Sequence, residues 1–114
     1  MIAIIKSDFN KEIVDGLVEG CKRALISEEI EIISVPGAFE LPAAAKKYSE
    51  TKKFRAIITL GCVIKGDTDH YDYICQAVSK GIMDISINSD IPILFGILTC
   101  QNAELAFERS RNNE

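Results

Sequence analysis

One segment of this sequence gathers residue types that handle anions and protons. Residues 61–70 contain two glycines, a lysine, a threonine and the only histidine of the chain. Gly66 lets the backbone come close to a ligand, and Thr68, with the free N–H groups of a following helix, favours an anion such as phosphate. His70 falls in the first turn of that helix, where the helix dipole disfavours imidazolium. The segment therefore predicts a neutral imidazole that accepts a proton at about pH 7.

Each of these assignments has an ordinary alternative. A single histidine at a helix start is more often a surface residue than a catalyst. The segment also contains neither of the two common glycine-rich phosphate-binding patterns, G-x-x-x-x-G-K-[ST] and G-x-G-x-x-G. Residue types alone therefore leave proton transfer and an anion site as hypotheses.

A second segment, residues 35–42, combines a turn with a carboxylate and an aromatic ring. Glu40 falls in the first turn of the next predicted helix, where the helix dipole stabilises a carboxylate. The helix dipole alone can explain why a glutamate stands here. The functional alternative is that its carboxylate accepts hydrogen bonds from a polyol. Phe9 and Phe39 lie in predicted loops and not on core stripes. Each is either a stacking face for a flat heterocycle or part of the rim of the core.

Predicted strands and helices, which would hold these residues, alternate along the chain. Apolar runs predict strands at residues 1–6, 30–35, 56–60 and 93–98. Helical spacing follows each of them: after Asn10 as the N-cap, from Leu41 with Pro42 in the first turn, along residues 71–85, and over residues 103–110. This alternation is typical of an α/β domain with a parallel sheet. Ligands bind such sheets at the carboxyl ends of the strands, which are followed here by residues 7–10, 36–40, 61–70 and 99–102.

Composition excludes several classes of function. The 114 residues suit one domain. The net charge of −4, without a basic cluster, disfavours nucleic acid and anionic membrane surfaces. The apolar runs are too short to span a bilayer, and no basic region precedes the first of them, so we expect a cytoplasmic protein. The four cysteines form no C-x-x-C pair and only one histidine accompanies them, so no metal site is predicted.

Several segments resemble one enzyme family, in order and over nearly the whole chain. VPGAFELP at residues 35–42, GCVIKGDTDHYDY at residues 61–73 and PILFGILT at residues 92–99 are similar to segments of the 6,7-dimethyl-8-ribityllumazine synthases, as are Asp8-Phe9-Asn10 and Glu108-Arg109. The resemblance implies a three-layer α/β/α, flavodoxin-like sandwich with a four-stranded parallel sheet. It also implies homopentamers, which in some members build icosahedral shells.

The resemblance further implies a reaction and its residues. 5-Amino-6-(D-ribitylamino)uracil condenses with 3,4-dihydroxy-2-butanone 4-phosphate, and phosphate and water leave, without a metal or an organic cofactor. Phe9, Ala38, Phe39 and Glu40 would hold the heterocycle and its ribityl chain, and Glu40 would take ribityl hydroxyls. The remaining implied contacts are backbone groups of Cys62, Val63 and Ile64 for the pyrimidine edge, Asp67 and Thr68 for phosphate, His70 for proton transfer, and Phe95 and Arg109 from a neighbouring subunit.

The chain also departs from the family pattern. Asp8 stands where the family usually has arginine. We expect residues 1–114 to form a single lumazine synthase domain without the family's N-terminal strand and C-terminal helix, and without a lysine that helps bind phosphate. Two other readings stay open: a non-catalytic lumazine- or flavin-binding relative and a pentameric riboflavin synthase. A phosphoacceptor signalling domain is discounted, because it needs an acidic cluster after the first strand, where only Asp8 is present, and an aspartate at the end of the third. The intact segment from Gly61 to His70 favours the lumazine-forming enzyme.

Overall fold

Strands and helices alternate in the computed structural model, which describes residues 1–65, 71–100, 104, 108 and 109. In chain order the elements are β1 (Ile2–Ser7), α1 (Lys11–Ala24), β2 (Ile30–Val35), the short 3-10 helix η1 (Ala38–Glu40), α2 (Leu41–Ser49), β3 (Ala56–Ile64), α3 (Tyr71–Asn88) and β4 (Ile93–Cys100). None of the helices in this part of the chain is long and apolar enough to cross a membrane.

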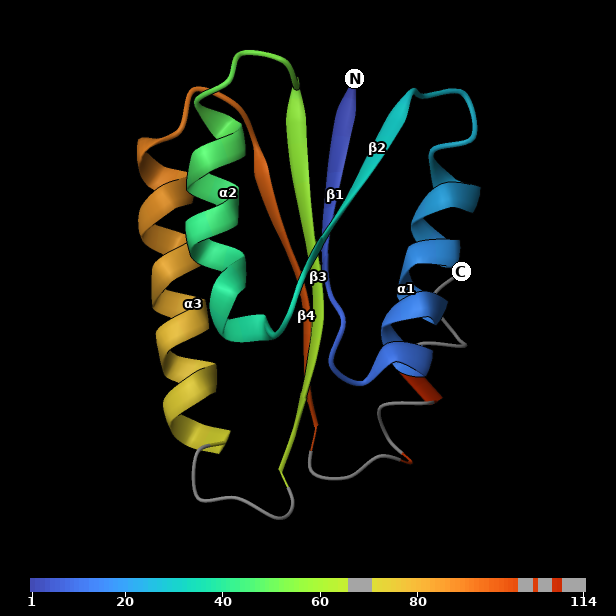
Figure 1. Cartoon of the computed structure of the whole chain (residues 1–114), viewed down its shortest axis with the longest axis vertical. Coiled ribbons are helices and arrows are strands. Elements are labelled where there is room, and N and C mark those ends of the chain that lie inside the picture. Colours follow the sequence, from blue (N-terminus) through green and yellow to red (C-terminus); the bar gives the residue numbers. More distant parts are fainter. Residues whose placement is uncertain (66–70, 101–103, 105–107, 110–114) are drawn as a thin grey trace.

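All four strands are parallel and lie in the order β2-β1-β3-β4. Helix α1 covers one face of the sheet, and α2 and α3 cover the other (Figure 1). The predicted three-layer α/β/α architecture is therefore confirmed. The chain leaves β1 toward β2 and then crosses back over β1 to β3, so the direction of winding reverses between β1 and β3. In open parallel sheets, ligands bind at the carboxyl ends of the strands at such a reversal.

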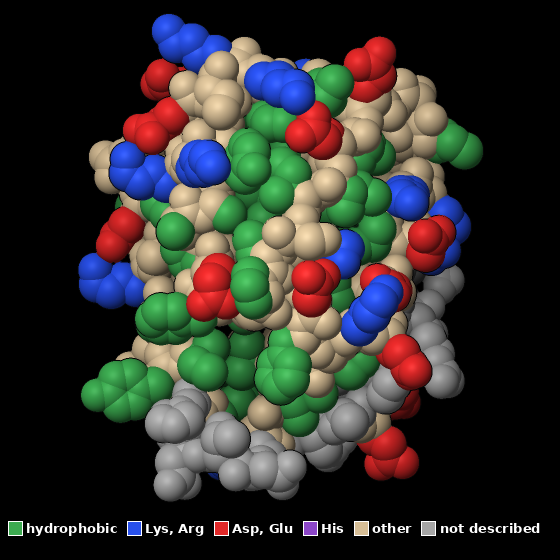
Figure 2. All heavy atoms as spheres, viewed as in Figure 1, with side chains coloured by type: hydrophobic (Ala, Val, Ile, Leu, Met, Phe, Trp, Pro, Cys, Tyr) green, Lys and Arg blue, Asp and Glu red, His purple; other side chains and the backbone are tan. Residues whose placement is uncertain are grey.

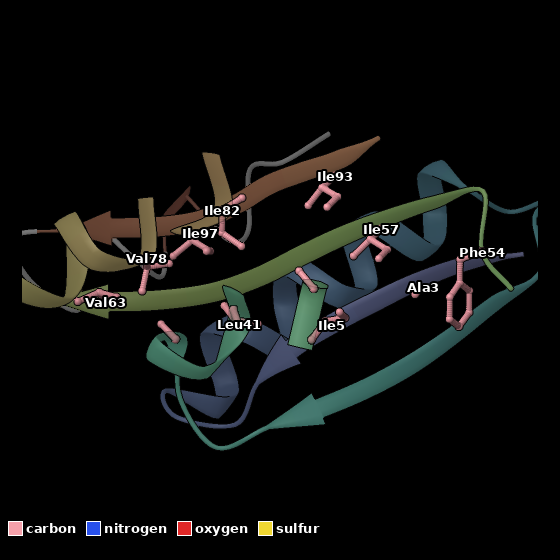
Figure 3. Close-up of a cluster of buried hydrophobic side chains, with 12 residues drawn as sticks. Ala3, Ile5, Leu41, Phe54, Ile57, Val63, Val78, Ile82, Ile93 and Ile97 are labelled. Atoms are coloured by element: carbon pink, nitrogen blue, oxygen red, sulfur yellow. The ribbon is translucent and has the colours of Figure 1, made fainter. Parts of the chain in front are cut away.

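Each face of the sheet has its own buried core, because both faces are covered and successive side chains of a strand point to opposite sides. Ile5 of β1 belongs to the cluster beneath α2 and α3, which Figure 3 shows, whereas the preceding Ile4 belongs to the cluster beneath α1. This arrangement explains why the strands read as continuous apolar runs and not as alternating patterns.

Helices α2 and α3 approach each other closely at one glycine. A Cβ atom added to Gly81 of α3 would lie 2.9 Å from both Cβ and Cγ of Pro42 in the first turn of α2. The position of Pro42 confirms the prediction that this helix begins at Leu41. The close contact packs α2 and α3 side by side on one face of the sheet (Figure 1).

Two predicted strand ends are wrong. Strand β3 continues past residue 60 to Ile64, and β4 continues past residue 98 to Cys100. The added residues at the two ends pair with one another, Val63 with Thr99 and Ile64 with Cys100. Gly61 suggested the start of a loop, but it fits within the strand because Leu41 and Ser7 pack against it. The predicted helix at residues 103–110 lies mostly outside the described residues.

Candidate functional site

A pocket of about 350 Å³ opens at the carboxyl ends of β1 and β3, where the winding of the sheet reverses. Hydrophobic side chains gather at this end of the molecule, the lower end in Figure 2. The lining comes from the β1–α1 loop, the β2–α2 connection, the end of β3 and the start of α3: Phe9, Asn10, Gly37, Ala38, Phe39, Cys62, Val63, Ile64, Tyr71 and Ile74. None of these described lining residues is charged. The pocket therefore suits a flat, neutral ring.

Backbone hydrogen bonds join the β1–α1 loop to the end of β2 and the residue that follows it. The N–H of Asp8 donates to the carbonyl of Val35 at 2.8 Å, and the N–H of Phe9 donates to the carbonyl of Pro36 at 3.1 Å. These bonds continue the pairing of β1 with β2 beyond the ends of both strands. They bring the loop that carries Phe9 against the turn that leads from β2 into η1, which carries Phe39.

Phe9 and Phe39 are 71% and 61% exposed, and both line the pocket. The prediction that they lie in loops is confirmed for Phe9 but wrong for Phe39, which belongs to the 3-10 helix η1. Neither residue belongs to the two buried clusters. An aromatic ring this exposed contributes little to the core. Its flat face is free to stack on a ligand.

The end of β3 presents backbone and small side chains to the pocket. Cys62 points into the cluster beneath α1 and is 3% exposed, whereas Val63 points into the opposite cluster. The carbonyl oxygen of Cys62 accepts a hydrogen bond from Nδ2 of Asn10 at 3.1 Å. Three adjacent residues, Cys62 to Ile64, therefore line the pocket while their side chains also pack in or against the two core clusters.

The thiol of Cys62 is unsuited to nucleophilic chemistry. Burial, assisted by the nearby Cys100, raises the pKa of Cys62 from 9.0 to about 12. The thiolate is the reactive form of cysteine, so the buried thiol is inert at neutral pH. The folded chain holds this proton more tightly than the unfolded chain does. The free energy of unfolding therefore falls on account of this group only as the pH rises from about 9 to about 12.

We expect iodoacetamide at about pH 8 to leave Cys62 unmodified in the native protein and to alkylate it rapidly in guanidinium chloride. Peptide mass spectrometry after timed quenching measures both rates at this one residue. Cys21, which is only partly buried, provides an internal comparison in the same sample. Native alkylation of Cys62 as fast as that of Cys21 would contradict the buried, protonated thiol.

Three predicted site residues are described but do not line this pocket. Glu40 belongs to η1, just before the helix in which it was predicted, and its Oε1 lies 3.1 Å from where a Cβ of Gly37 would be, at the pocket edge. Phe95 is 48% exposed on β4, an edge strand. Nη1 of Arg109 donates to Sγ of Cys100 at 3.5 Å. Asp67, Thr68 and His70 lie outside the described residues.

Two lining residues with polar side chains were not predicted as site residues. Asn10 was expected to cap α1 through its side chain, but the side chain makes no capping bond and turns to β3 instead. Tyr71 was assigned to the core stripe of its helix, yet it also lines the pocket. Burial is the main cause that raises the pKa of Tyr71, so its hydroxyl stays protonated and able to donate. Only its place directly after His70 hinted at the site.

A larger cavity, of about 740 Å³, lies at the opposite end of the sheet, between the ends of α2 and α3. Charged side chains on its rim pair with neighbours: Lys46 with Glu50 at 3.0 Å, and Asp84 with Lys80 at 2.9 Å. The described residues contain no cluster of three or more His, Cys, Asp or Glu side chains suited to a metal ion. The pocket at the winding reversal is therefore the candidate site.

The comparison with protein families agrees with the motifs and with the position of the pocket. The family model described as 6,7-dimethyl-8-ribityllumazine synthase matches residues 1–114, the full length of the chain. Enzymes of this family are transferases that act in riboflavin biosynthesis. The chain belongs to the 6,7-dimethyl-8-ribityllumazine synthase family.

Proposed function

We propose that this chain condenses 5-amino-6-(D-ribitylamino)uracil with 3,4-dihydroxy-2-butanone 4-phosphate to form 6,7-dimethyl-8-ribityllumazine, with release of phosphate and water. The observation that carries the proposal is the pocket at the winding reversal. Six of the residues expected to touch the heterocycle line it together: Phe9, Ala38, Phe39, Cys62, Val63 and Ile64. They come from three separate segments, so their convergence supports a shared ligand.

The proposed binding mode follows from the chemistry of the lining. The pyrimidinedione stacks on Phe9, and Phe39 and Ala38 border it. Backbone groups at the end of β3 meet its polar edge. Glu40, exposed at the rim, accepts hydrogen bonds from the ribityl hydroxyls. No charged group is needed beside the ring, which is neutral.

The phosphate and the proton are assigned to residues of the segment before α3 and of a neighbouring subunit. Asp67 and Thr68 bind the phosphate, and Arg109 pairs with it through its guanidinium. His70 transfers the proton as the amine attacks the ketone. Because two substrates must be held amine to ketone, much of the rate enhancement comes from proximity.

A homopentamer completes the proposed site. Neither Phe95 nor Arg109 is among the described residues that line the pocket of the same chain. Phe95 lies half exposed on the edge strand β4, where an adjacent subunit can meet it. In the proposed assembly it covers the heterocycle of the neighbouring pocket.

The first test is to mix the protein with both substrates and follow lumazine fluorescence against a protein-free blank. Formation well above the blank is expected. Replacing Phe9 with alanine should weaken lumazine binding about tenfold or more, because stacking on an aromatic ring contributes about 1–3 kcal/mol. Titration of intrinsic lumazine fluorescence measures the affinity.

The control for this variant is Ile26→Ala, which removes an exposed hydrophobic side chain (88% exposed) that does not line the pocket. It should bind lumazine as the unmodified protein does. Equal affinity of the Phe9→Ala variant and the unmodified protein would reject stacking on Phe9. No lumazine above the blank, at any protein concentration, would reject the proposed reaction.

A further inference from the structure

Asn10 has a backbone conformation that few residues adopt. Its φ and ψ are 59° and 49°, in the left-handed region, which asparagine tolerates better than most residues. Its carbonyl accepts the N–H groups of Ile13 and Val14, both at 3.1 Å, and α1 starts at the next residue. The turn at Asn10 therefore sets the direction in which the chain leaves Phe9.

The side chain of Asn10 joins two walls of the pocket. Its Nδ2 donates to the carbonyl oxygen of Cys62 at 3.1 Å, across 52 positions of sequence, in a partly buried place. Both residues line the pocket. The bond therefore ties the β1–α1 loop directly to the end of β3.

Two hydrogen bonds hold the backbone around Phe9. Its own N–H is bonded to Pro36, and the residue after it is bonded to Cys62. Since the ring of Phe9 is 71% exposed, side-chain packing contributes little to its position. The hydrogen-bonded backbone on either side of it therefore determines where the ring lies. We infer that Asn10 is a positioning residue, which holds Phe9 and the end of β3 at the spacing that the heterocycle requires. This inference rests on the proposed function.

Two variants distinguish the effect of the Asn10 side-chain amide from the effect of its left-handed backbone conformation. Asn10→Gly keeps access to the left-handed region and removes the amide. Asn10→Asp keeps the size and the tolerance of positive φ, but replaces the donor by an acceptor facing the carbonyl of Cys62. The matched control is Lys52→Gly, because Lys52 is the other non-glycine residue with a positive φ (61°) in the described part of the chain and does not line this pocket.

Two measurements test the inference. Fluorescence titration should show lumazine affinity two- to tenfold lower in both Asn10 variants, as expected for one lost hydrogen bond. The KM for the ribitylaminouracil should rise while kcat falls less. Amide hydrogen exchange, read by NMR, should be faster at Phe9 in both variants and unchanged along β1. Lys52→Gly should alter neither readout.

The outcomes are distinguishable from failure of the proposed function. If the unmodified protein binds no lumazine, the proposed function fails, and exchange at Phe9 still decides whether Asn10 holds the loop. If the unmodified protein binds lumazine but both Asn10 variants bind it equally well, the inference is overturned. A uniform loss of protection through β1 and α1 would also overturn it, because Asn10 would then serve general stability.

Discussion

Alanine in place of His70 is expected to lower the rate of lumazine formation by about two orders of magnitude without abolishing it. General acid–base catalysis by one side chain contributes about 10²–10⁴-fold, and the lower end applies where proximity supplies much of the acceleration. A site that only aligns the amine and the ketone should still exceed the blank, because proximity accelerates the condensation without a proton-transfer group. Single-turnover fluorescence with saturating substrates measures the residual rate.

The same variant should keep its affinity for lumazine, because a proton-transfer residue acts mainly in the transition state. Titration with the product provides this control. A pH profile of the residual rate should lack any inflection of the unmodified enzyme that is due to the imidazole. Complete loss of turnover with lumazine affinity intact would mean that His70 does more than transfer a proton and that proximity contributes little.

Gly96→Ala is expected to be the most damaging small substitution in the sheet. The added methyl group would lie 2.7 Å from Cδ2 of Leu60 and 2.9 Å from the carbonyl oxygen of Thr59. Leu60 is 3% exposed and cannot turn to solvent, and the carbonyl belongs to the backbone of the central strand β3. Overpacking of this kind costs about 1–3 kcal/mol, which lowers the Tm by roughly 5–20 °C in a domain of this size.

Urea denaturation followed by circular dichroism measures the free energy of unfolding for this variant. The matched control is Gly37→Ala, whose added methyl group would meet only Oε1 of Glu40, at 3.1 Å. That atom is the far end of an exposed, flexible side chain, so the free energy of unfolding should change by less than about 0.5 kcal/mol. Equal midpoints for the two variants would show that β4 moves away from β3 at little cost.

Local patterns in the chain predicted the class of fold and most of its elements. The apolar runs predicted the four strands, and helices α1, α2 and α3 start where Asn10, Pro42 and Tyr71 indicated. These features depend on neighbours along the chain, such as the fixed φ of proline in a first turn. The resemblance to the lumazine synthases at residues 8–10, 35–42 and 61–73 also identified six lining residues of the pocket before any three-dimensional contact was known.

Contacts between distant segments decided the ends of two strands and the hydrogen-bond partner of Asn10. Gly61 read as a strand end by type, but pairing of β3 with β4 carries the strand on to Ile64. Asn10 is the N-cap residue of α1 as predicted, but its side chain makes no capping bond and donates to the carbonyl oxygen of Cys62, 52 positions away. Residue types and their spacing thus determined which elements form, and the motifs identified the family. Only the tertiary structure decided where β3 and β4 end and what holds Phe9 in place, because hydrogen bonds between distant segments compete with local preferences and no local pattern records them.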